Sequence, residues 1–122
     1  GSDRRARLRS AYERFHHDGM QLFRQLWDGL GSVPGVTRYG PGPDRPRTPT
    51  VSFTLDGVPS ESVAVALADK GLFVSHGDFY ASTIVRRLGH GDDGLVRVGM
   101  SCYSTADEVA RLLHALGELA RR

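Results

Sequence analysis

A strand, a turn and a capped helix are predicted by one stretch of the chain, Gly94-Leu-Val-Arg-Val-Gly-Met-Ser-Cys-Tyr-Ser-Thr-Ala-Asp-Glu-Val109. Arg97 lies among apolar residues, and a guanidinium on such a strand is costly unless an anion or a carboxylate satisfies its donors. Thr105 and Glu108 have the spacing of a helix-capping box. Arg97 is therefore the first site candidate, although strand alternation could instead leave it facing solvent, or paired with a structural acid.

Helical periodicity dominates both ends of the chain. Residues 3–30 are predicted to form one long amphipathic helix, which Gly19 interrupts, permitting close packing or a bend. Its apolar stripe comprises Leu8, Tyr12, Phe15, Leu22, Phe23, Leu26, Trp27 and Leu30. The helix that follows Thr105 should run to about residue 120, with a stripe of Val109, Leu112, Leu113, Leu116 and Leu119.

Between these helices the pattern predicts strands at 36–39, 50–55 and 72–75, in addition to the Arg97 strand. The strand at 50–55 alternates, which places Val51, Phe53 and Leu55 on one face. Helices are expected at 60–69, with Ser60 as N-cap, and within 78–88. The resulting order predicts an α+β two-layer sandwich, in which a small, mostly antiparallel sheet carries helices on one face.

These segments resemble the small C-terminal domain of fold-type I, class V aminotransferase-like enzymes, the family of cysteine desulfurases and selenocysteine lyases. There a strand arginine precedes Tyr-Asn-Thr and two acids, and Arg97 and Tyr103-Ser104-Thr105 occupy those places, with Ser104 where Asn is usual. The similarity covers nearly the whole chain and also includes Pro49-Thr-Val-Ser-Phe53, Gly57-Val-Pro-Ser60, Leu67-Ala-Asp-Lys-Gly71 and Gly77-Asp-Phe-Tyr80.

The resemblance implies that Arg97 forms a bidentate salt bridge to the α-carboxylate of an amino-acid substrate, a geometry that guanidinium suits. Residues 75–82 align with the active-site loop that carries the sulfur-accepting cysteine of true cysteine desulfurases, and Tyr80 holds that place. His76, Gly77, Asp78 and Tyr80 are therefore candidates for the pocket wall. Without a thiol in this loop, desulfuration through a persulfide is not expected.

Family members use pyridoxal 5′-phosphate (PLP), held mainly by a large domain that supplies the Schiff-base lysine. Lys70 is the only lysine here, and it has the position of a solvated cation at a helix C-terminus closed by Gly71. The resemblance thus implies that residues 3–122 are the small domain of a longer, homodimeric enzyme and are inactive alone. Gly1-Ser2 resembles the remnant of an expression tag.

Composition agrees with one compact domain, since the chain has 122 residues. A single cysteine, Cys102, excludes an intramolecular disulfide and fits a cytoplasmic protein, in which we expect it to be a small buried apolar residue. No apolar run approaches the ~20 residues that span a bilayer, so no membrane partner is expected. The histidines lack ligand spacing, so no metal site is expected either.

The net charge is +2, and the arginines that cluster at the N-terminus are diluted by acids. No nucleic-acid-binding motif accompanies them, so nucleic acid is not an expected partner. The residues alone leave a second function open. The chain could be a free-standing α+β module that binds an amino acid or another small anion, or that mediates dimerisation.

Overall fold

The computed structural model describes residues 3–122, so the predicted tag remnant lies outside the described residues. Within this range the elements follow the predicted order: α1 (Arg4–Ser32), β1 (Val36–Tyr39), β2 (Thr50–Leu55), α2 (Ser60–Ala68), β3 (Ser75–Gly77), α3 (Ser82–Arg87), β4 (Leu95–Gly99) and α4 (Ala106–Ala120). The described strands form one sheet in the order β1-β2-β4-β3, and each neighbouring pair is antiparallel. The α+β prediction is confirmed.

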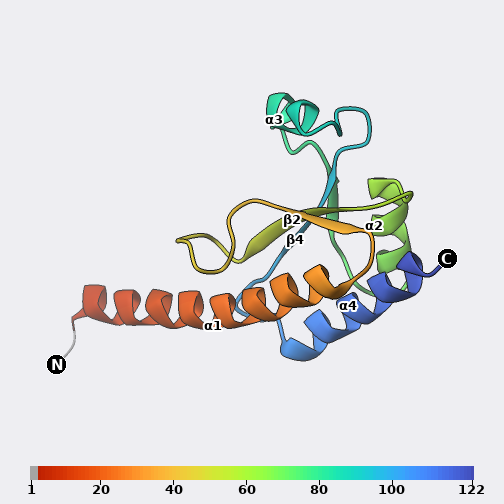
Figure 1. The fold of residues 1–122 in the computed structure, drawn as a ribbon. Coiled ribbons are helices and arrows are strands. Elements are labelled where there is room, and N and C mark those ends of the chain that lie inside the picture. Colours follow the sequence, from red (N-terminus) through yellow and green to blue (C-terminus); the bar gives the residue numbers. More distant parts are fainter. Residues whose placement is uncertain (1–2) are drawn as a thin grey trace.

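The helical layer covers one face of this sheet and is made by α1, α2 and α4 (Figure 1). α1 contacts β1 and β2, α2 contacts β2, β3 and β4, and α4 packs against both helices. The predicted inward faces of β2 and α4 meet in the core, whose most buried side chains are Phe23, Leu26, Leu30, Val51, Phe53, Val63, Leu67, Val96 and Leu116. α3 stands apart from this layer (Figure 1).

The first half of α1 projects beyond the sheet (Figure 1). The predicted long helix is present, but Leu8, Tyr12 and Phe15 of its stripe keep 49%, 70% and 51% of their surface exposed. The helical period is correct, but no other described element reaches that far. Burial begins at Gly19, where an added Cβ would lie 3.3 Å from Cγ of Pro49, which confirms the predicted close packing.

Two predicted boundaries differ from the structure. Pro59, not Ser60, is the N-cap of α2. Ser60 is buried, donates from its hydroxyl to the Asp93 carbonyl at 2.7 Å, and donates from its backbone N–H to the Asp93 carboxylate at 2.9 Å. β3 begins only at Ser75, because Phe73 in the predicted strand is 86% exposed and pairs with no strand. Both differences depend on contacts distant in sequence.

The capping box of α4 is present as predicted. The Thr105 hydroxyl accepts from the Glu108 N–H at 3.2 Å, and the Glu108 carboxylate accepts from the Thr105 N–H at 2.9 Å. These bonds satisfy two backbone donors that the helix itself leaves without partners. The cap fixes where the chain leaves the turn after β4 and enters the helical layer.

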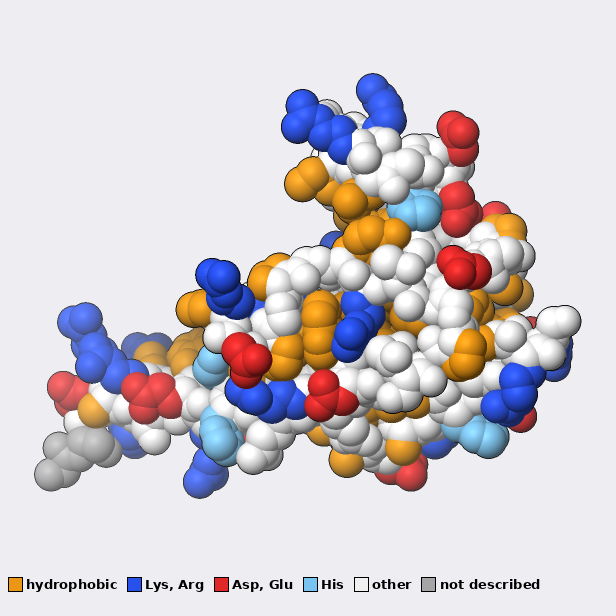
Figure 2. Space-filling view, in the orientation of Figure 1, with side chains coloured by type: hydrophobic (Ala, Val, Ile, Leu, Met, Phe, Trp, Pro, Cys, Tyr) orange, Lys and Arg blue, Asp and Glu red, His pale blue; other side chains and the backbone are white. Residues whose placement is uncertain are grey.

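Charged side chains are spread over the visible face, with basic ones at the projecting end of α1 and around α3 (Figure 2). Acidic side chains lie among those of α1, as the sequence indicates (Figure 2). Among the described residues, no helix combines the length and the apolar character needed to cross a membrane.

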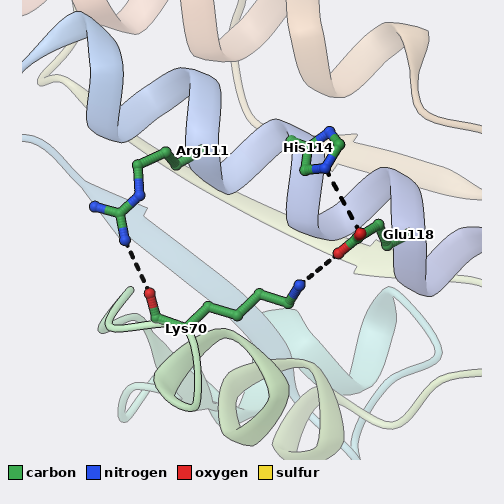
Figure 3. A network of polar contacts seen from close by, with 4 residues as sticks. All are labelled: Lys70, Arg111, His114 and Glu118. Atoms are coloured by element: carbon green, nitrogen blue, oxygen red, sulfur yellow. Dashed lines mark hydrogen bonds and ion pairs between the residues drawn. The ribbon is translucent and has the colours of Figure 1, made fainter.

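Lys70, which follows α2, connects the end of that helix to α4 through polar contacts (Figure 3). Its Nζ pairs with the Glu118 carboxylate, and its carbonyl accepts a hydrogen bond from Arg111 at 2.9 Å. Nε2 of His114 lies 3.6 Å from the same carboxylate. The hydrogen bond from Lys70, followed by its positive charge, lowers the pKa of Glu118. Lys70 is thus an exposed cation at a helix C-terminus, as the sequence predicts, and it also links two helices.

Gly94 brings the start of β4 against the end of β3. An added Cβ there would lie 2.5 Å from the carbonyl carbon of Gly77, and φ at Gly94 is +82°, a conformation that side chains disfavour. Only glycine meets both conditions. The close approach therefore holds the loop after β3 next to the strand that carries Arg97.

We expect Gly94→Ala to lower the free energy of unfolding by more than about 2 kcal/mol, because it adds a backbone clash to the strain of a positive φ. The matched control is Gly57→Ala. Its φ is +73° but no atom lies within 4 Å of the added Cβ, so it should cost only about 1 kcal/mol. Urea denaturation of the two variants measures both values. Equal losses of unfolding free energy in the two variants would show that the close approach of Gly94 to Gly77 does not restrict residue 94 to glycine.

The Lys70–Glu118 pair should make stability depend on pH. The folded-state pKa of Glu118 is lowered, so the stabilisation is complete above the ordinary glutamate pKa of about 4.3 and is lost as pH falls through the folded value. Thermal unfolding of Lys70→Met should therefore differ from that of the original chain at neutral pH and converge with it in acid. Lys70→Arg keeps the charge and is the control. A difference that persists below pH 2 would contradict the assignment.

Candidate functional site

Arg97 occupies the middle of β4, on the sheet face opposite the helices. Its Cα partners are Ser52 on β2 and Ser75 on β3, and directly paired residues project to the same face. Its chain neighbours Val96 and Val98 point into the core. Side chains of β4 alternate between the two faces of the sheet, so a charged residue can stand between two buried valines. The guanidinium is exposed, which is the outcome that strand alternation predicts.

No acidic side chain within residues 3–122 lies at salt-bridge distance from Arg97. A structural ion pair, the other explanation left open by the sequence, is therefore not present in this part of the chain. The guanidinium keeps its N–H donors for an external group. A carboxylate matches those donors with two parallel hydrogen bonds.

An aromatic ring from the loop after β3 packs on Arg97. The guanidinium carbon lies 4.1 Å from the ring centroid of Phe79, a cation–π arrangement. Phe79 and Tyr80 have φ angles of 54° and 61°, a conformation that costs a non-glycine residue of order 1–3 kcal/mol. Asp78 supports this turn, because its carboxylate accepts from the Tyr80 N–H at 3.0 Å and its carbonyl accepts from the Ala81 N–H at 2.8 Å.

A shallow hollow of ≈ 510 Å³ opens beside Arg97. Hydroxyl groups and one cation line much of it, and none of its lining residues is acidic: Thr48, Thr50, Phe73, Val74, Ser75, Arg97 and Gly99. Such a lining favours a small anion over a cation. The hollow is open to solvent on this face, so the chain by itself supplies one wall of a site and not an enclosed pocket.

The loop residues singled out from the sequence lie in different places. His76 pairs with Val96, so it projects to the sheet face opposite Arg97. Gly77 forms the close approach to Gly94. Asp78 stabilises the turn, and Tyr80 is fully exposed. Phe79, which contacts Arg97, lies in the same loop before α3 but was not among the residues predicted for the pocket wall.

Residues that could bind a cofactor or a metal are few in this part of the molecule. Lys70 does not fit a Schiff base to PLP, since its Nζ is held by Glu118. Cys102 is exposed, which corrects the expectation that it is buried, because the chain turns outward after β4. Across the described range, no three metal-ligating side chains gather in one place.

Comparison with known proteins gives a consistent result. Residues 9–112 match the family model Aminotransferase class-V. The chain is 39% identical over 100 residues to an aminotransferase-like protein of Gibberella zeae, which covers 79% of this chain and 25% of that protein. It is 32% identical over 97 residues to a probable cysteine desulfurase of Pseudomonas putida, covering 80% of this chain and 23% of the relative.

A solved structure has the same fold. The apo cysteine desulfurase of Thermococcus onnurineus superposes with a TM-score of 0.83 at 28% identity, over 89% of this chain and 26% of that one. The chain thus spans about a quarter of the length of the curated relatives it matches. The sequence match, which covers most of the chain, and the shared fold lead to one conclusion: the chain belongs to the aminotransferase class-V family.

Proposed function

We propose that this chain is the small C-terminal domain of a longer PLP-dependent enzyme that acts on an amino acid, and that Arg97 binds the substrate α-carboxylate. The observation that carries the proposal is the exposed guanidinium beside a hollow without acidic lining, with no acid of the described chain paired to it. The chain covers about a quarter of its relatives, so a larger part remains to complete the site.

Arg97 recognises the group that all α-amino acids share. Its two parallel N–H donors fix both the position and the orientation of a carboxylate, whereas a lysine would act as a point charge. Hydroxyls of Thr50 and Ser75 in the same hollow can add weaker hydrogen bonds. The substrate side chain would then be selected by groups outside this chain.

The cofactor would be bound by the rest of the longer protein. Enzymes of this family bind PLP, which supplies an electron sink to an attached amino acid. The residues of this chain do not fit the lysine role, because Lys70 is paired with Glu118. The isolated chain is therefore expected to be inactive, with its part in the reaction limited to holding the substrate.

The remainder of the longer protein would also cover the projecting half of α1. Leu8, Tyr12 and Phe15 form an exposed apolar stripe there, and soluble proteins usually bury such a stripe. We assign this surface to contact with the large domain of the same enzyme. By resemblance the enzyme would be a homodimer, and the single cysteine fits a cytoplasmic location.

Desulfuration through a persulfide on this chain is not part of the proposal. The loop that carries the sulfur-accepting cysteine in true cysteine desulfurases has Tyr80 at the aligned place, and a phenol does not form a persulfide. Cys102 is exposed but follows β4 on a different connection. Transamination, elimination and racemisation remain the reactions consistent with these residues.

Replacing Arg97 with Gln in the longer, PLP-loaded protein should weaken amino-acid binding about 10- to 100-fold, because one charge-assisted hydrogen-bonded pair is lost. The cofactor's own absorbance should stay unchanged. Titration with L-alanine, followed by the change in the cofactor spectrum, measures the dissociation constant. Arg87→Gln on exposed α3 is the matched control. Equal affinities for the Arg97 variant and the original protein would remove the assigned role.

Cys102→Ser in the longer protein should leave the rate with any amino-acid substrate unchanged, L-cysteine included, since no sulfur transfer passes through this chain. Persulfide labelling after incubation with L-cysteine should give no modified peptide that contains residue 102. A labelled peptide, together with loss of sulfide release in the variant, would reinstate desulfuration for this protein.

A further inference from the structure

We infer that Phe79 is a positioning residue for substrate binding: its ring holds the guanidinium of Arg97 in one orientation, with the N–H donors left available to a carboxylate. The inference rests on the proposed role of Arg97 and adds a second residue to that site. It assigns Phe79 a role that was not apparent from the sequence.

The geometry allows stacking and carboxylate binding at the same time. The guanidinium carbon lies over the Phe79 ring, 4.1 Å from its centroid, so the ring occupies one side of the group. All five N–H donors of an arginine lie in the plane of the guanidinium. A carboxylate approaches along that plane, and the ring therefore does not compete with it.

The ring supports Arg97 where the residues paired with it in the sheet are too short to do so. Its paired neighbours on this face, Ser52 and Ser75, have short side chains. A long, exposed side chain samples many rotamers, and binding must then include the entropy cost of fixing it. A ring already stacked on the guanidinium reduces that cost before the substrate arrives.

The loop itself is built to keep the ring there. Phe79 and Tyr80 both adopt positive φ, and such strained residues persist only where their surroundings fix them. The Asp78 carboxylate fixes the turn through the Tyr80 N–H, and the approach of Gly94 to Gly77 fixes the strand that leads into it. Phe79 takes no part in the main hydrophobic core, so core packing does not account for its position.

The experiment compares Phe79→Leu, which removes the ring, with Phe79→Trp, which keeps an aromatic face. In the longer, PLP-loaded protein, the dissociation constant of L-alanine is measured from the cofactor spectrum. In this 122-residue chain, NMR of the arginine side chains follows the Arg97 Nε–H, whose shift reports a ring above it. Tyr12→Leu, which removes an exposed aromatic far along α1, is the NMR control, and the amide spectrum of each variant verifies folding.

We expect Phe79→Leu to weaken L-alanine binding about two- to fivefold and to move the Arg97 signal toward that of an unstacked arginine. Phe79→Trp should keep the dissociation constant of L-alanine within about a factor of two of the original value. The Arg97 signal of this variant should remain at the position of a stacked arginine. The kcat should change less than the affinity in both variants, because the ring acts on binding and not on the reacting atoms.

Two results would overturn the inference while leaving the proposed function intact. One is unchanged affinity in Phe79→Leu where Arg97→Gln still weakens binding. The other is an equal loss in Phe79→Leu and Phe79→Trp, which would assign the effect to the loop shape and not to the stack. If Arg97→Gln also has no effect, the proposed role of Arg97 fails, and the role of Phe79 fails with it.

Discussion

The pairing of β4 with both β2 and β3 is the constraint on which the rest of this structure depends. It sends Val96 and Val98 into the core, where burying each side chain contributes roughly 1.5–3 kcal/mol, and it turns Arg97 to the opposite face between Ser52 and Ser75. A register shift of one residue would expose the valines and bury the guanidinium. The core therefore fixes the position of the site, even though no site residue belongs to the core.

The same strand also sets how the neighbouring loop meets Arg97. β3 is short and is held by the approach of Gly94 to Gly77, so the residues that follow it begin from a fixed point. The Asp78 turn then directs Phe79 toward the guanidinium. One strand and one strained turn thus place a cation over an aromatic ring, beside an open hollow. That hollow is open to solvent on this face of the sheet.

Local signals in the sequence predicted much of this fold. The alternation at β2, the stripe of α4 and the Thr105–Glu108 box each depend on residues close in sequence, and each is present. The features that the sequence did not predict depend on contacts between residues far apart in the chain. Ser60 lost its capping role to a contact with Asp93, and the stripe at Leu8, Tyr12 and Phe15 has no described partner to pack on. Arg97 could be predicted as a site residue from the sequence of its own strand. Phe79 could not, because its ring reaches Arg97 only through the pairing of β3 with β4 and the positive φ of Phe79.

The most direct test is an experimental structure of the longer protein with PLP and an amino acid bound. We expect both carboxylate oxygens to accept hydrogen bonds from the Arg97 guanidinium at about 2.7–2.9 Å, with the Phe79 ring still on the guanidinium face. The carboxylate bound by a different cation, with Arg97 facing solvent, would contradict the assignment. It would reduce this chain to a structural domain of the enzyme.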